Sequence, residues 1–157
     1  MSEFLLRVQE SIRIGRPIDV VRRQFGDVRH HEIRRPHRGV QFTLLTDSGN
    51  ECRYRHEVRV VGLRQVAEVV LRRDADGSQT NHFVSGPNAG MRVIHRFQAD
   101  GPDATVAEVT IEMPMRGVRR LLAPVVRRFL HASLVTGLEE DRRDIEERGY
   151  PASGSMR

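Results

Sequence analysis

The chain has a single cysteine, Cys52, and neither tryptophan nor lysine. One cysteine excludes an internal disulfide and any metal site built from a cysteine cluster. No apolar run approaches the roughly 20 residues that a membrane-spanning helix needs. Arg7, Glu10 and Arg13 interrupt the start of the chain, where a signal peptide would be apolar. We therefore expect a soluble, cytoplasmic protein and not an integral membrane protein.

The basic residues are 26 arginines, which exceed the 21 acidic residues and give a net charge of +5. Most of them lie beside acidic residues, as in residues 51–60 and 139–148, and the chain has no basic tail. This pattern is typical of a solvated surface, so no nucleic-acid partner is predicted. The length fits one domain. We predict a single domain over residues 1–150 and a disordered tail over residues 151–157.

The first third of the chain predicts one strand and two short helices. Residues 5–14 alternate between apolar and polar side chains, as a half-buried strand does, with Glu10 as an acidic exception on the apolar face. Pro17 is well placed to open a helix. A second short helix follows Asp27, a suitable N-cap, and Pro36 ends it.

The middle of the chain predicts six more strands, each bounded by turn residues. Their short connections indicate antiparallel hairpins, one of which is the glycine-rich turn at 85–90. From Gly117 the apolar residues recur at steps of three and four over some thirty residues, which predicts a long amphipathic helix. Pro124 predicts a kink or the true start of this helix. The six strands are expected at residues 39–45, 51–60, 63–73, 78–85, 91–98 and 104–113.

This succession of elements resembles the START-like superfamily, also called SRPBCC, and more narrowly its polyketide cyclase/dehydrase-type members. The resemblance covers residues 4–147 and is carried by residues 11–28 and 110–147, where LLAP at 121–124 matches the family's "ll.P" element. Many members carry tryptophans in the second short helix, whereas this chain has RHHE at 29–32. Ligand contacts made by those tryptophans therefore do not carry over.

The resemblance implies an α+β, helix-grip fold. In this fold a curved antiparallel sheet of about seven strands wraps around the long C-terminal helix, two short helices follow the first strand, and a cavity lies inside. Because strand side chains alternate between faces, we predict which residues line that cavity. Tyr54, His56 and His95 are the candidate catalytic groups, with a packing role as the alternative. The predicted ligand-binding residues are Glu10, Cys52, Val58, Met91, Val93, Phe97, Ala107, Val109, Ile111, Leu122, Val126 and Phe129.

Three histidines close in sequence raise the question of a metal site. Asp27, His30 and His37 resemble the spacing of the iron ligands in the catalytic domain of Rieske-type oxygenases, which share this fold. However, no later carboxylate stands out as a further ligand, and His30 and His31 are adjacent and cannot share a helix face. We therefore predict no metal and no cofactor. The histidines are expected to be exposed at the rim of the cavity.

Three functions remain open at this level. The first is binding of a hydrophobic small molecule such as a lipid, an isoprenoid or an aromatic polyketide. The second is a cofactor-independent polyketide aromatase/cyclase-dehydratase that uses the His and Tyr groups, and the third is an accessory protein-interaction module. An acyl carrier protein or an anionic surface is a further expected partner of the basic side chains of Arg119, Arg120, Arg127 and Arg128.

Overall fold

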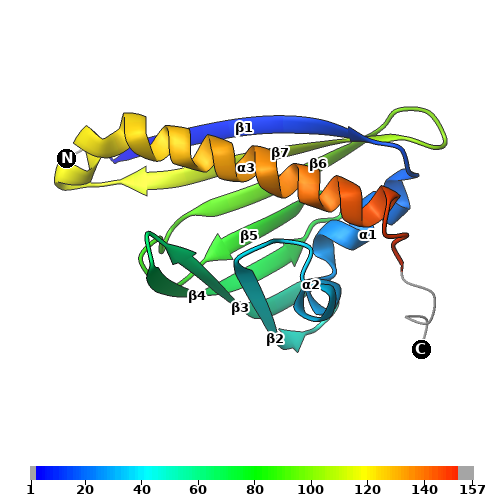
Figure 1. The fold of residues 1–157 in the computed structure, drawn as a ribbon, viewed down its shortest axis with the longest axis horizontal. Helices are drawn as coiled ribbons and strands as arrows, with labels where there is room; N and C mark the ends of the chain where they lie inside the picture. The colour runs from blue at the N-terminus through cyan, green and yellow to red at the C-terminus, as the bar shows by residue number, and fades with distance from the viewer. Residues whose placement is uncertain (1–2, 152–157) are drawn as a thin grey trace.

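The computed structural model describes residues 3–151, and its strands form one antiparallel sheet (Figure 1). Along the sheet the order is β1-β7-β6-β5-β4-β3-β2. The strands are β1 (Phe4–Ile14), β2 (Val40–Asp47), β3 (Glu51–Val60), β4 (Leu63–Arg73), β5 (Gln79–Phe83), β6 (Arg92–Ala99) and β7 (Thr105–Met115). The helical segments are α1 (Ile18–Gly26), α2 (Val28–Arg34), η1 (Gly117–Leu122) and α3 (Ala123–Glu146). The predicted helix-grip architecture is confirmed.

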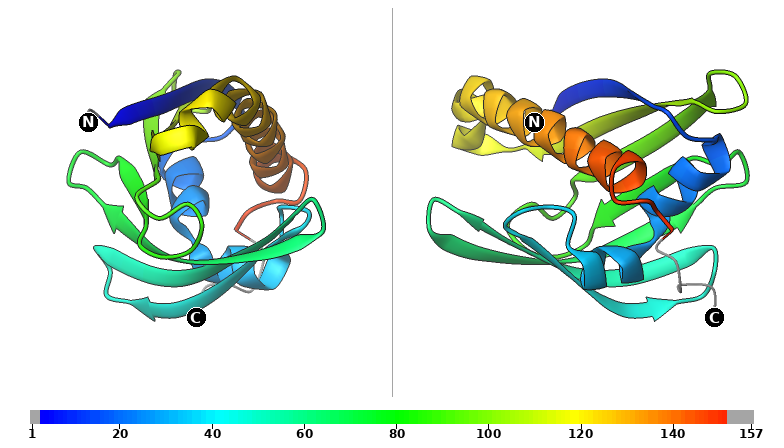
Figure 2. Two further views of the ribbon diagram at one scale, coloured as in Figure 1. Left: turned by 90° about the vertical axis from the view of Figure 1, so that its left-hand side faces the viewer. Right: turned by 45° about the vertical axis from the view of Figure 1, so that its right-hand side comes forward.

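The sheet curls around one face of α3, as the left view of Figure 2 shows. Helix α3 packs against β1 and α1, while α2 packs against β2. The buried stripe of α3 contains Leu130, Leu134, Leu138 and Ile145, at the spacing of one helix face. Each such side chain stabilises the fold by roughly 1.5–3 kcal/mol when fully buried. The core between α3 and the sheet therefore holds the two ends of the chain together.

The end of the last strand differs from the sequence expectation. Pro114 does not close β7, because β7 continues to Met115 and Pro114 lies opposite Leu5 of β1. The pairing of β7 with β6 has already ended at Glu112, so Pro114 stands where one side of the strand needs no amide donor. The expected tail at 151–157 lies, apart from Pro151, outside the described residues.

The long helix begins where its proline predicts. Pro124 lies in the first turn of α3, where its missing amide hydrogen is not needed, and the 3₁₀ segment η1 precedes it. By length and composition alone, Gly117–Glu146 is long and apolar enough to cross a membrane. This corrects the expectation that no segment reaches that length. The buried leucines of α3 show that one face of the helix serves the core.

Candidate functional site

A pocket of about 170 Å³ lies between the inner face of the sheet, the two short helices and the second half of α3. Its walls are mostly aromatic and aliphatic, and a few polar groups converge on it. This composition is typical of a small-molecule site. The lining residues are Phe25, Val28, His31, His37, Phe42, Tyr54, His56, Leu71, Asn81, Phe83, Val93, His95 and Asp141.

The pocket brings together all three predicted catalytic groups. Tyr54 and His56 reach it from β3, and Val93 and His95 reach it from β6. Alternation along each strand places these side chains on the inner face. Of the residues predicted to bind ligand, Val93 alone is among those that line this pocket.

The other predicted ligand-binding residues lie elsewhere. Glu10 faces α3 but pairs with His131, whose Nε2 is 2.6 Å from the Glu10 carboxylate. Leu122, at the end of η1, and Phe129, near the start of α3, are both exposed. The buried face of α3 begins at Leu130 instead. Val58 is half-buried toward the far end of β3. The remainder pack in or against the core: Cys52, Met91, Phe97, Ala107, Val109, Ile111 and Val126.

Aromatic rings surround the polar groups of the pocket. The His56 ring lies 5.6 Å from that of Phe42 and 5.5 Å from that of Phe83, both edge to face. The His95 ring meets Phe25 at 5.3 Å, also edge to face. Such contacts fix the orientation of the imidazoles without hydrogen bonds. Nδ1 of His95 is buried and has no hydrogen-bond partner within residues 3–151.

Burial lowers the pKa of both pocket histidines, because removal from water disfavours the imidazolium ion. It lowers the pKa of His56 to about 4, and the nearby His37 adds to the effect. It also lowers the pKa of His95 to about 4, against an opposing pull from Asp141. At neutral pH both rings are uncharged, so each has one nitrogen that donates and one that accepts.

His31 is buried, and His30 and His37 are largely buried, which corrects the expectation of an exposed histidine cluster. Their side chains are only 10%, 7% and 15% exposed, because each faces a carboxylate of α3. Nε2 of His30 lies 2.6 Å from Oδ2 of Asp144. Nδ1 of His37 lies 2.9 Å from Oε2 of Glu140. The histidines therefore join the short helix and its following loop to α3.

Asp141, which the sequence did not single out, is the carboxylate that lies beside both His31 and His37. Its Oδ1 lies 3.4 Å from Nε2 of His31 and 3.3 Å from Nε2 of His37. Burial would lower the pKa of His37, but Asp141 and Glu140 raise it to about 10. Burial would likewise raise the pKa of Asp141, but His37 and His31 hold it below its usual range. Negative charge is thus stable at Asp141 despite its burial.

Asp27 has a different role from the one its spacing suggested. Its Oδ1 accepts a hydrogen bond of 2.9 Å from the backbone amide of His30, as the predicted N-cap of α2. Its Oδ2 accepts a hydrogen bond of 2.7 Å from the Tyr150 hydroxyl. The possible metal-ligand atoms that come together are therefore those of His31, His37 and Asp141. The predicted set of Asp27, His30 and His37 is not the one that does so.

Two signals in the sequence would have found further pocket residues. Asn81 has the same strand parity as Gln79 and Phe83, which are also buried. Asp141 follows Leu134 and Leu138 at the spacing of one helix face, so an acidic residue interrupts the buried stripe of α3. A carboxylate at such a position is rarely buried without a partner, and it marks a polar site in the core.

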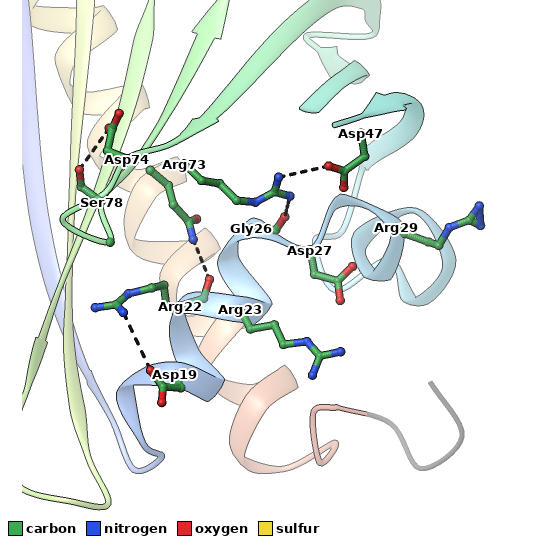
Figure 3. Close-up of a pocket in the computed structure, with 12 residues that line it drawn as sticks. Asp19, Arg22, Arg23, Gly26, Asp27, Arg29, Asp47, Arg73, Asp74 and Ser78 are labelled. Carbon is green, nitrogen blue, oxygen red and sulfur yellow. Dashed lines mark hydrogen bonds and ion pairs between the residues drawn. The ribbon is translucent and has the colours of Figure 1, made fainter. Parts of the chain in front are cut away.

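A second cleft, of about 430 Å³, lies on the surface beside α1 (Figure 3). Its charged groups mainly contact one another and the backbone. Arg73 donates to the carbonyl of Gly26 at 2.7 Å and to Asp47 at 3.3 Å, and Gln79 donates to the carbonyl of Arg22 at 2.8 Å. These contacts brace α1 against the sheet, whereas the smaller inner pocket holds the candidate chemistry.

No protein-family model matches the sequence, and no curated protein matches it. Among solved structures, the Zhui aromatase/cyclase from Streptomyces sp. R1128 aligns with a TM-score of 0.75 at 16% identity, over 93% of this chain and 99% of that one. A START superfamily protein from Mycobacterium smegmatis aligns with a TM-score of 0.76 at 13% identity, over 90% and 98%.

The fold is START-like. Norcoclaurine synthase from Thalictrum flavum, in complex with dopamine and hydroxybenzaldehyde, has the same architecture, with a TM-score of 0.69 at 11% identity over 93% of this chain and 89% of that one. These structural alignments establish the START-like fold. At identities this low they do not establish function, which has to be argued from the residues of the pocket.

Proposed function

We propose that this START-like domain binds a small, mainly aromatic molecule that carries a polar group. The observation that carries the proposal is the inner pocket, in which Phe25, Phe42 and Phe83 face the neutral imidazoles of His56 and His95. Aromatic walls favour a flat apolar ligand. The imidazoles supply a donor and an acceptor for a hydroxyl or carbonyl group of that ligand.

The volume of the pocket supports a ligand with one ring. At about 170 Å³, it is close to the roughly 150 Å³ of an apolar cavity that holds benzene. Drug-sized ligands occupy pockets of about 300–1,000 Å³. A lipid, an isoprenoid or a multi-ring polyketide would have to extend beyond this volume, so a monocyclic compound is the better fit.

Cyclase–dehydratase chemistry in the same pocket is the second candidate, because His56, His95 and Tyr54 all reach it. A general acid or base works best when its pKa lies near the operating pH. The pKa of each histidine is about 4, and burial raises that of Tyr54 above its ordinary value. Binding and orientation therefore suit these groups better than proton transfer.

Calorimetric titration of the purified protein with p-cresol and with 2-naphthol tests the proposal. We expect p-cresol to bind more tightly than the fused-ring compound. Val93→Phe fills the pocket and should weaken p-cresol binding more than about 10-fold, since a filled pocket leaves no room for a second ring. The matched control is Val84→Phe, which adds the same ring where the side chain is 51% exposed and outside the pocket.

Equal p-cresol affinity in the two variants would contradict the proposal, as would tighter binding of 2-naphthol. Turnover of a poly-β-ketone that is lost in His95→Phe, with an unchanged melting temperature, would favour the cyclase instead. Ligand-independent binding to another protein would favour the interaction module. A cytoplasmic location is part of the proposal, because the free, buried thiol of Cys52 suits a reducing compartment.

The arginines of η1 and α3 support a contact with an anionic lipid surface. Leu121 is 82% exposed and Phe129 is 53% exposed, so apolar side chains stand beside the charges. Helical spacing places Arg128 in the same exposed sector as Val125 and Phe129. A surface that combines basic and apolar groups fits the headgroup region of a bilayer, and an acidic carrier protein is the alternative outcome of the test.

A further inference from the structure

Three side chains from separate parts of the chain converge in the wall of the pocket. His31 comes from α2, His37 from the loop that follows it, and Asp141 from α3. One ligand atom from each lies within 4.8 Å of the other two. Two imidazole nitrogens and one carboxylate oxygen form a donor set that suits Zn²⁺ or Fe²⁺.

The outer nitrogens of both imidazoles are held by other groups. Nδ1 of His31 lies 2.8 Å from the backbone carbonyl oxygen of Asp27, and Nδ1 of His37 lies 2.9 Å from Oε2 of Glu140. Both partners are acceptors, so each Nδ1 carries a proton and donates it. With Nδ1 protonated in this way, a metal ion would take the place of the Nε2 proton and bind the Nε2 lone pair. Both Nε2 atoms point at Asp141. Metal-binding histidines are commonly oriented by such bonds to a carbonyl or a carboxylate.

The distances at Asp141 fit ligands around an ion better than an ion pair. Nε2 of His31 and of His37 lie 3.4 Å and 3.3 Å from its Oδ1. Charge-assisted N–H···O bonds are shorter, at about 2.7–2.9 Å. Tetrahedral ligands at about 2.0–2.1 Å from a metal ion lie about 3.3–3.4 Å from one another. The carboxylate is also braced, because Nε2 of Gln24 donates to the same Oδ1 at 3.0 Å.

We propose that His31, His37 and Asp141 bind a divalent transition-metal ion, Zn²⁺ or Fe²⁺, in the wall of the pocket. This reverses the sequence expectation of no metal. All three side chains line the pocket that also contains His56 and His95. The coordination position that they leave open therefore faces the space for the small molecule. Three protein ligands with one open position are the arrangement of reactive rather than structural metal sites.

Metal-free protein, prepared by dialysis against a chelator, tests the proposal when it is titrated with Co²⁺ as a spectroscopic probe. We expect one equivalent to bind and to give the visible absorption of a tetrahedral site. Zn²⁺ should displace it and raise the melting temperature, because an ion that binds the folded state stabilises it. Azide should change the Co²⁺ spectrum by entering the open position.

Variants distinguish this site from adventitious binding. His37→Ala and Asp141→Asn should each weaken Co²⁺ binding more than about 100-fold. The matched control is His131→Ala, whose ring pairs with Glu10 on the other half of α3 and should leave Co²⁺ affinity unchanged. Should the two ligand variants fail to fold, the spectrum and the Zn²⁺ displacement in the wild-type protein still decide the matter.

Three results would overturn the proposal. The first is a wild-type protein that takes up no Co²⁺ after chelator treatment, and the second is an affinity that His37→Ala leaves unchanged. The third is a Co²⁺ spectrum that shows only fully hydrated ions. In each case His37 and Asp141 would be a buried ion pair without a metal. The outcome is independent of the proposed function, because it does not require the aromatic ligand to bind.

Discussion

The hydroxyl of Tyr54 donates a hydrogen bond of 2.8 Å to Oδ1 of Asn81. Tyr54 lies on β3 and Asn81 on β5, so this buried bond passes across the inner side of β4. It satisfies two polar groups in the wall of the pocket and fixes the Tyr54 ring against Phe42, at a centroid distance of 5.4 Å. The polar part of the pocket is therefore built by cross-strand contacts.

Replacement of Tyr54 by phenylalanine should destabilise the fold while preserving the ring. Oδ1 of Asn81 would lose its donor in a buried place, which costs about 1–3 kcal/mol. Urea denaturation gives the free energy of unfolding. The double variant Tyr54→Phe/Asn81→Leu removes both polar groups and should recover part of the loss. An unchanged free energy of unfolding in Tyr54→Phe would show that the bond contributes nothing.

Acid should destabilise the protein through His56 and His95. Each has a pKa of about 4 in the folded state, below the ordinary histidine value of 6.5, so the unfolded chain binds more protons between these two pH values. Their contribution to stability is present above about pH 6.5 and is lost as the pH falls toward 4. Urea denaturation at a series of pH values measures this dependence.

The variant His95→Phe should show a shallower loss of stability over the same pH range, because one of the two groups is gone. Phe97→Leu is the control. It lies on the same inner face of β6 and loses packing without removing an ionisable group. It should lower stability at every pH and keep the slope. The same slope in all three proteins would assign the acid sensitivity to other groups.

Binding to vesicles should depend on the exposed apolar and basic groups of η1 and α3. Vesicles that contain phosphatidylserine should sediment the protein, and binding should weaken with added salt because screening reduces the attraction. Phe129→Glu should reduce binding several-fold. The control is Leu63→Glu, at an exposed position on β4, outside η1 and α3. The same loss of vesicle binding in both variants would contradict a membrane-binding surface on η1 and α3. Equal binding to vesicles of phosphatidylcholine alone would contradict a preference for anionic lipid.

The turn between β5 and β6 requires glycine at position 86 for two reasons. Gly86 has a φ of 82°, and a Cβ atom there would lie 2.5 Å from the carbonyl oxygen of Val66. Gly62 has a φ of 77° with open space around it, so it provides the matched control. Gly86→Ala should lower the melting temperature more than Gly62→Ala, which has only the backbone strain of about 1–2 kcal/mol. Equal shifts would mean that the backbone contact is relieved without cost.

Much of the fold follows from local patterns in the sequence. Alternation in residues 51–60 correctly predicts that Cys52 and Tyr54 are buried, because a strand has only two faces. Pro124 predicts the start of α3, since a proline ring fits the first turn of a helix. Alternation gives the facing of a side chain but not the distance along the strand. It therefore did not distinguish His56, which reaches the pocket, from Val58, which does not line it.

The sequence by itself determined the order of the elements and the inner faces of the strands, because both depend on residues a few positions apart. Only the tertiary structure decided which polar groups meet. His31 and Asp141 are 110 positions apart, and their contact depends on how α3 lies across the curved sheet. That placement is set by the packing of the whole core. Histidines predicted on an exposed helix and its following loop therefore lie beside a carboxylate in the interior.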